Sequence, residues 1–225
     1  MKIIVSDAWK TAYPAARVGA LLVEGASNPS GNPSLDARKA EIVRGLRERF
    51  AGAERSTLSA LPSIAPYVAY YDRFKKTYHV LLQLESVAQK GRDLPHMPGL
   101  VSAMFMAELG NQLLTAGHDA DALRQPVTLD IATGDEAYTL LNGQAQTLKA
   151  GDMYMRDAEG VISSIIYGPD GRTRIAGGTR SAFYVVYAPP GIQTPALENH
   201  FDDLLRYIRL FAPDAKEAQR VIFEA

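Results

Sequence analysis

The hydrophobic pattern of the chain changes near His118, and this change restricts the possible folds more than any other feature. Between residues 35 and 116 apolar side chains recur at three- and four-residue spacing, as on helices. Between 126 and 188 they form short alternating or β-branched runs, separated by turns such as Asn142-Gly143. From 194 to 225 the pattern predicts helix again. A block of strands between helical segments predicts an α+β fold.

We expect residues 1–225 to form one domain, because no repeat or low-complexity linker divides them. The β-rich block 126–188 is the expected centre of this domain. The strongly apolar helix predicted over 99–116 is expected to pack against that block. A further helical stretch, 61–91, is expected to break near Pro66.

The chain contains 225 residues, no cysteine and a formal net charge of −1. The lack of cysteine excludes disulfides, a thiol nucleophile and cysteine-based metal sites. The net charge is not that of an overall basic nucleic-acid-binding protein, although a local basic patch is compatible with it. The apolar run in LVSAMFMAELG is too short to span a bilayer, and MKIIVSDAWK is too short in apolar length for a secretory signal. We expect a soluble, cytoplasmic protein that does not bind membranes.

Familiar catalytic and cofactor motifs are absent: the sequence has no P-loop, dinucleotide fingerprint, nucleophile elbow or paired-histidine zinc motif. The segment GHDADAL (117–123) places His118 near Asp119 and Asp121, which is compatible with a metal site. A helix end at Gly117, followed by a turn capped by Asp119, explains the aspartates equally well. The role of His118 stays open at this point. We expect no metal and no cofactor.

Basic and aromatic residues gather at YYDRFKKTYH (70–79). Arg73, Lys75 and Lys76 could neutralise RNA phosphates while the neighbouring aromatic rings stack on bases. The alternative is an amphipathic helix whose basic face is only solvated.

The segment VISSIIYGPDGRTRI (161–175) predicts two short strands joined by a turn. Its turn carries more polar groups than turn formation needs. A guanidinium, a hydroxyl and a carboxylate within one loop could hold a small zwitterion, or the loop could be an ordinary solvated turn. The groups concerned are Tyr167, Gly168, Asp170, Arg172 and Thr173.

Three consecutive pieces of the chain resemble a known family. They are the helix GLVSAMFMAELG, the segment that begins GHDADALRQPVTLDIATGDEAYTLLNG, and the hairpin VISSIIYGPDGRTRI, and together they cover residues 99 to 178. This region resembles the tRNA-editing domain (B-three/B-four) of the phenylalanyl-tRNA synthetase beta subunit. The catalytic and acceptor-binding parts of a synthetase are absent, so the chain resembles a free-standing editing module.

The resemblance implies a β-sandwich-like core, mixed or antiparallel, with flanking helices. It also implies hydrolysis of an amino acid wrongly attached to tRNA, tyrosine in the family. The family pocket has a helix hydroxyl, a histidine after that helix and a glutamate on the hairpin. Ser102 falls at the hydroxyl position and Asp170 is the carboxylate available at the glutamate position. Leu114 occupies the histidine position. His118 could take the place of the family histidine only if the alignment includes a short insertion.

The resemblance therefore implies Asp170 and His118 as catalytic groups. An aminoacyl ester is intrinsically labile, so positioning and an oriented water would suffice. A non-catalytic module that binds tRNA or an amino acid is the alternative. The residues expected to bind substrate are Ser102, Tyr167, Gly168, Arg172 and Thr173, and those expected to bind tRNA are Arg73, Lys75 and Lys76.

Overall fold

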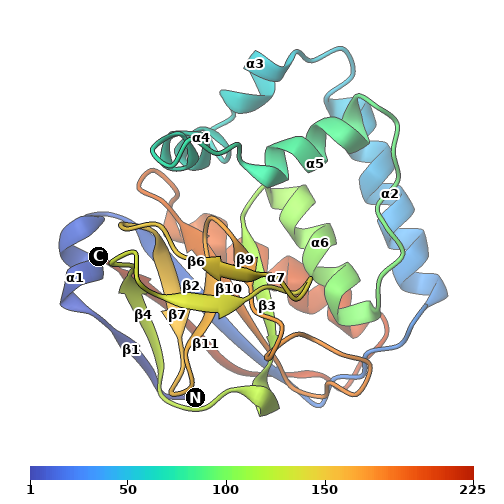
Figure 1. The fold of residues 1–225 in the computed structure, drawn as a ribbon. Coiled ribbons are helices and arrows are strands. Elements are labelled where there is room, and N and C mark those ends of the chain that lie inside the picture. Colours follow the sequence, from blue (N-terminus) through green and yellow to red (C-terminus); the bar gives the residue numbers. More distant parts are fainter.

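The computed structural model describes residues 1–225 and has a mixed α+β architecture, with two β-sheets and flanking helices (Figure 1). Helices α2 to α6 gather on one side of the sheets, and α7 lies behind them in this view. The helices are α1 (Asp7–Ala12), α2 (Pro33–Arg49), α3 (Arg55–Ser59), α4 (Ala65–Asp72), α5 (His79–Ala88), α6 (Gly99–Asn111) and α7 (Thr194–Arg209), with a 3₁₀ turn, η1 (Ala120–Ala122). The strands are β1 (Ile3–Val5), β2 (Arg17–Glu24), β3 (Thr115–Asp119), β4 (Val127–Ile131), β5 (Ala137–Thr139), β6 (Ala145–Thr147), β7 (Met153–Arg156), β8 (Val161–Ser164), β9 (Gly168–Pro169), β10 (Ala182–Ala188) and β11 (Lys216–Glu224).

The larger sheet has five strands in the order β1-β4-β7-β8-β9, and the other has four in the order β11-β2-β10-β3. The first is mixed, because β1 pairs parallel to β4 while its other pairs are antiparallel. The second is antiparallel throughout. Side chains of both sheets belong to one cluster of 56 buried hydrophobic residues. The short hairpin β5–β6 forms a two-stranded sheet of its own, which packs on the larger sheet where Tyr138 meets Tyr154 and Val161.

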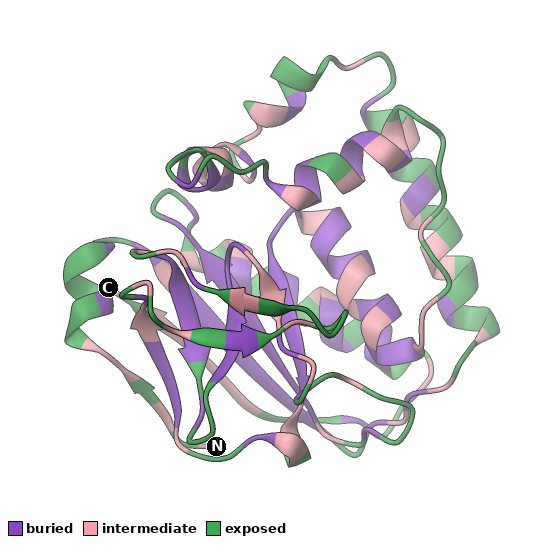
Figure 2. Cartoon of the chain, viewed as in Figure 1, coloured by how far each residue is buried: buried purple, intermediate pink, exposed green.

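Helix α7 is amphipathic, and its apolar stripe covers β2 and β11. Leu197, Phe201, Leu204 and Ile208 recur at three- and four-residue spacing, and each is fully buried. The approach to β2 is close at Gly19, where a Cβ would lie 2.7 Å from the Phe201 ring. The absence of a side chain at this strand position therefore lets the helix settle on the sheet. Figure 2 shows the contrast between the buried strands and the exposed outer face of α2.

The structure corrects three boundaries that the hydrophobic pattern suggests. Residues 216–224 form strand β11, not the end of a helix, because they pair along nearly the whole of β2. Pro66 does not break a helix but lies in the first turn of α4, where its missing N–H costs nothing. The interruption comes instead at residues 73–78, between α4 and α5.

Helix α6 ends at Asn111, earlier than the apolar pattern predicts. Gln112 adopts a left-handed conformation with φ 55°, and its side-chain amide donates to the carbonyls of Leu109 and Gly110. The last carbonyls of the helix are thus satisfied, and the chain turns into β3. This turn places Thr115 and Gly117 opposite the same helix that they follow.

Truncation of Phe201 tests how much the α7–β2 contact contributes to stability. We expect Phe201→Ala to lower the free energy of unfolding by about 3–5 kcal/mol, the usual cost of removing a fully buried aromatic ring. Leu210→Ala is the matched control, since Leu210 is 36% exposed just beyond the same helix; we expect it to cost less than about 1 kcal/mol. Urea denaturation measures both. Equal losses would contradict this packing.

Candidate functional site

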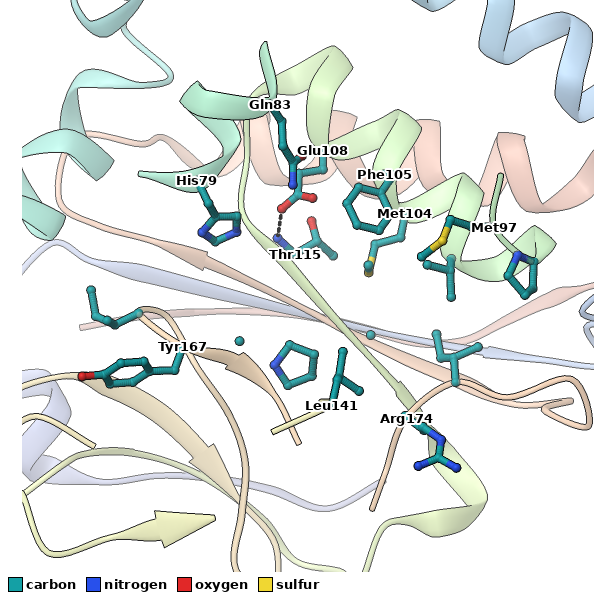
Figure 3. A pocket seen from close by; sticks show the side chains of 17 residues that line it. His79, Gln83, Met97, Met104, Phe105, Glu108, Thr115, Leu141, Tyr167 and Arg174 are labelled. Atoms are coloured by element: carbon teal, nitrogen blue, oxygen red, sulfur yellow. Dashed lines mark hydrogen bonds between the residues drawn. The ribbon is translucent and has the colours of Figure 1, made fainter. Parts of the chain in front are cut away.

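A cavity of about 460 Å³ lies between α6, the start of α5, strand β3 and the hairpin after β8. Helix α6 presents four side chains to it at the spacing of one helical face: Val101, Met104, Phe105 and Glu108. Figure 3 shows polar groups gathered at one end, and the sulfur and phenyl groups beside them. The other lining residues are His79, Gln83, Met97, Pro98, Thr115, Gly117, Leu141, Ile166, Tyr167, Gly168, Pro169, Arg174 and Ile175.

The carboxyl group of Glu108 lies at the polar end and is almost completely buried, with 2% of the residue exposed. Its Oε1 accepts a hydrogen bond from the backbone N–H of Thr115 at 3.3 Å, and no positive charge contributes to the shift of its pKa. Burial raises the pKa of Glu108 to about 8. The group therefore holds its proton at neutral pH, and it would lose that proton if a cation entered the cavity.

The hydrogen bonds of His79 decide which of its ring nitrogens carries the proton. Tyr71 donates its hydroxyl proton to the carbonyl of Ile165, so the Tyr71 oxygen can only accept from His79 Nδ1, 3.1 Å away. Burial lowers the pKa of His79 to about 4, which keeps the ring neutral near pH 7. His79 Nε2 is then an unprotonated nitrogen, able to accept a hydrogen bond or a proton.

Gln83 adds another acceptor to this end of the cavity. Its side-chain oxygen Oε1 is buried and has no hydrogen-bond partner. An unpaired buried carbonyl is costly, and it is satisfied when a donor binds beside it. Together with His79 Nε2 and the Glu108 carboxyl group, it makes this end a place for a hydrogen-bond donor.

Away from the polar end the cavity lining is mostly apolar, with Arg174 as its one charged residue. Met97, Met104 and Phe105 line the part beside the polar end (Figure 3). Gly117 contributes bare backbone: a Cβ there would lie 2.9 Å from Ile175 Cδ1 and 3.0 Å from Met104 Sδ. The flexible thioethers make this part adaptable to different apolar groups.

Only part of the residue set expected from the sequence lines this cavity. Tyr167 and Gly168 do, as elements of the hairpin, and Gly168 has φ 81°. Ser102 does not line it, because it lies on another face of α6 and its Oγ donates to the carbonyl of Met97 at 2.7 Å. Asp170 and Arg172 line a smaller hollow of about 210 Å³ beside Tyr138.

Asp170, Thr173 and His118 come together in the protein interior. The Thr173 hydroxyl donates to Asp170 Oδ1 and lies 2.7 Å from His118 Nδ1, from which it accepts. His118 Nε2 lies 3.2 Å from Ser163 Oγ, so both ring nitrogens are engaged. Burial lowers the pKa of His118 to about 3. Asp170 and His118, which the resemblance implies as catalytic groups, are thus buried, and their hydrogen bonds join β3, β8 and the hairpin.

The guanidinium group of Arg172 is held by carboxylate groups of the protein. Its guanidinium pairs with Asp157 at 2.8 Å and Glu159 at 3.2 Å, and Nε lies 3.7 Å from Asp170. These contacts fasten the hairpin to the loop before β8. The guanidinium therefore has few hydrogen-bond donors left for a ligand.

The segment 70–79 does not form the single helix expected from its sequence. Arg73, Lys75 and Lys76 are exposed, in the stretch between α4 and α5. The aromatic side chains expected to stack on bases are buried instead, namely Tyr70, Tyr71, Phe74 and Tyr78. Only the basic groups remain available to a partner.

The acidic residues near His118 also have internal roles. Asp119 caps η1, accepting from the N–H of Asp121 at 3.0 Å, and its other oxygen accepts from Thr179 at 2.6 Å. No group of three or more His, Asp and Glu side chains lies close enough together to hold a metal ion. His200 is fully buried, and its Nε2 lies 2.8 Å from Thr115 Oγ1. No helix combines the length and the apolar character that crossing a bilayer requires.

The polar end of the cavity was not predicted from the sequence, although one signal was present. Glu108 is the one charged residue in the apolar stretch 99–109. A helix that is apolar on every side is buried, so a carboxyl group within it is buried too and needs a local reason. His79 and Gln83 carry no such signal, because their role depends on how α5 approaches α6.

Comparison with known proteins shows a likeness of fold to solved structures. No family model matches the chain, and no curated protein matches it. Among solved structures, the fold is similar to an N-terminal fragment of the phenylalanyl-tRNA synthetase beta subunit from Pyrococcus horikoshii, with a TM-score of 0.51 and 12% identity. The match covers 100% of this chain and 54% of that one, so the chain spans about half the length of its structural neighbour. At this identity the likeness concerns the fold alone.

The buried carboxyl group of Glu108 predicts a distinctive dependence of stability on pH. Because its folded-state pKa is about 8, the folded protein retains a proton that the unfolded chain has lost, and stability falls as pH rises from 7 to 8. The expected fall is about 1 kcal/mol. We expect Glu108→Gln to remove most of it, while the exposed Glu198→Gln leaves it unchanged. A smaller fall remains in Glu108→Gln, because burial also raises the pKa of Asp152, to about 7. Urea denaturation at the two pH values gives the comparison, and an undiminished fall in Glu108→Gln would contradict the assignment.

Asp170 is predicted to be a stabilising residue, because it is buried and accepts from the hydroxyl and the N–H of Thr173. Asp170→Ala leaves these donors unpaired and should cost about 1–3 kcal/mol. Asp170→Asn retains an acceptor oxygen and should cost less. The exposed Asp135→Ala serves as control. Thermal and urea denaturation measure the differences. If Asp170→Ala leaves the free energy of unfolding unchanged, the carboxylate belongs to an ordinary solvated turn.

Proposed function

We propose that this protein binds the aminoacyl end of a tRNA, with the acyl group in the cavity between α6 and the hairpin, and hydrolyses its ester bond. The observation that carries the proposal is the acceptor-lined end of the cavity. The Gln83 oxygen and the Glu108 carboxyl group suit an α-ammonium group, which has only donors to offer, and His79 Nε2 is left to accept from a water molecule. The apolar remainder suits an amino-acid side chain.

The fold likeness supports the same proposal from a separate direction. The structural neighbour is a fragment of a synthetase beta subunit, and we infer that residues 1–225 act as one unit of the editing-domain type. The cavity also lies between the helix and the hairpin on which the sequence resemblance rests. The proposed acyl site uses Glu108, His79 and Gln83 rather than Asp170 and His118.

His79 is the proposed general base. A water molecule attacks the ester carbonyl carbon while Nε2 takes a proton from it. The tetrahedral intermediate then collapses, the bond to the ribose oxygen breaks, and that oxygen receives the proton. Free amino acid and tRNA with a free terminal hydroxyl are the products. Glu108, ionised by the bound ammonium group, holds the substrate.

A binding module without hydrolysis is the second candidate. One observation favours it: burial lowers the pKa of His79 to about 4, which makes a weak base. In addition, the hydroxyl group nearest the polar end, Thr115 Oγ1, is engaged by His200. In this alternative the same groups recognise the aminoacyl end and leave the ester intact.

Deacylation of a panel of mischarged tRNAs tests the proposal and separates the two candidates. His79→Asn keeps a donor for Tyr71 but removes Nε2, so we expect kcat to fall about 100-fold with little change in KM. Glu108→Gln should mainly raise KM, because it cannot ionise to pair with the ammonium group. His96→Asn is the control, as His96 is exposed and lies outside the cavity.

The possible outcomes are distinct. Tight binding of an aminoacyl-tRNA without release of the amino acid would favour the binding module. Hydrolysis that is unaffected by His79→Asn would reject the proposed base. Absence of both binding and hydrolysis across the panel would overturn the proposed function.

A further inference from the structure

A second hollow, of about 410 Å³, lies where the loop after α4 meets the segment that follows β6. Its lining consists of Arg73, Phe74, Lys75, Lys149 and Ala150. Three of these five residues are cationic, and no Asp or Glu lines the hollow. We call it the basic notch.

The cationic groups of the basic notch have no acidic partner. Lys149 Nζ donates to the backbone carbonyl of Phe74 at 2.7 Å, which fixes its charge beside the segment that carries Arg73 and Lys75. The Arg73 guanidinium lies over the ring of Tyr13, 5.0 Å from the centroid. None of the three forms an ion pair within the protein. Unpaired positive charges around a hollow, two of them fixed by contacts within the protein, favour a bound anion.

The basic notch is connected to the cavity through one residue. Lys76, next to Lys75, places its Nζ 5.5 Å from the centre of the Tyr167 ring. Tyr167 lines the cavity, and Tyr71 further anchors this segment to the hairpin through the carbonyl of Ile165. A ligand that extends from the cavity past Tyr167 therefore passes Lys76 before it reaches the notch.

We propose that the basic notch binds a phosphate group of the nucleotide whose aminoacyl part occupies the cavity. This inference rests on the proposed function and makes it more specific. The ligand is an aminoacyl nucleotide with a 5′-phosphate, and a free amino acid would leave the notch empty. Arg73, Lys75 and Lys149 hold the phosphate, while Lys76 and Tyr167 flank the sugar and base between the two sites.

The test compares two stable ligands that differ only in the phosphate group. One is 3′-deoxy-3′-(phenylalanylamino)adenosine, and the other is its 5′-monophosphate. We expect the phosphate to tighten binding about tenfold, equivalent to about 1.4 kcal/mol, when measured by calorimetry at low salt. Inorganic pyrophosphate is the third probe, because it can occupy the notch alone.

Two variants remove charge without disturbing the backbone. Lys75 has φ 56°, a conformation that asparagine tolerates well, so Lys75→Asn is the suitable change. Lys149→Met retains the length of the side chain. Both should abolish the gain from the phosphate and leave binding of the nucleoside unchanged. Lys90→Met, which alters an exposed lysine outside the notch, should retain the full gain.

Each outcome bears on a different proposal. If the wild-type protein binds the nucleoside and its 5′-monophosphate with equal affinity, the proposed phosphate site is wrong, and the proposed acyl site is unaffected. A second outcome is that pyrophosphate binds to the wild-type protein but not to Lys149→Met, while neither of the two adenosine ligands binds. This result would support the phosphate site in the notch and count against the acyl site. A phosphate gain that survives both variants would place the phosphate elsewhere. No binding of any probe would reject both.

Discussion

Strand β10 is buried along its whole length. Its side chains and carbonyl groups contact both sheets and two of the helices, and these contacts hold those elements in position. Within its own sheet it pairs with β2 and β3. The hydroxyl of Tyr187 reaches across to Ser163 of the other sheet at 2.9 Å, and Tyr184 donates to the carbonyl of Leu100 in α6. The carbonyl of Tyr187 accepts from Tyr67 in α4 at 2.6 Å. One strand thus links the two sheets to each other and holds both α4 and α6, of which α6 bounds the cavity.

Local sequence patterns predicted the general architecture, because they report burial on each element separately. The change in hydrophobic period near His118 correctly indicates an α+β fold, and the apolar spacing around Phe201 correctly indicates α7. The C-terminal strand is not visible in this way, since residues 216–224 become a strand through pairing with β2 at the other end of the sequence. Its apolar residues, Val221 and Phe223, are compatible with either structure when read alone.

The candidate site was predicted less well, for a related reason. The polar residues of the hairpin suggest a binding site in the sequence. In the structure, however, Thr173 forms hydrogen bonds with Asp170 and with His118 inside the protein. The groups that face the cavity are Glu108 and His79, whose position depends on the packing of α5 against α6. Polarity along the sequence shows that a group needs partners, but it does not distinguish partners within the protein from a ligand.

Gly117 gives the cavity an unusual evolutionary property. Its place on β3 is held by pairing with Tyr184 of the neighbouring strand, while the atoms nearest to its absent side chain are the tips of Ile175 and Met104. A single-codon change to alanine would therefore place a methyl group against these two flexible tips and, at 3.3 Å, against the buried ring of Tyr184. The space in this part of the cavity can thus change by the size of one methyl group through a single substitution, provided that these three side chains shift by a few tenths of an ångström.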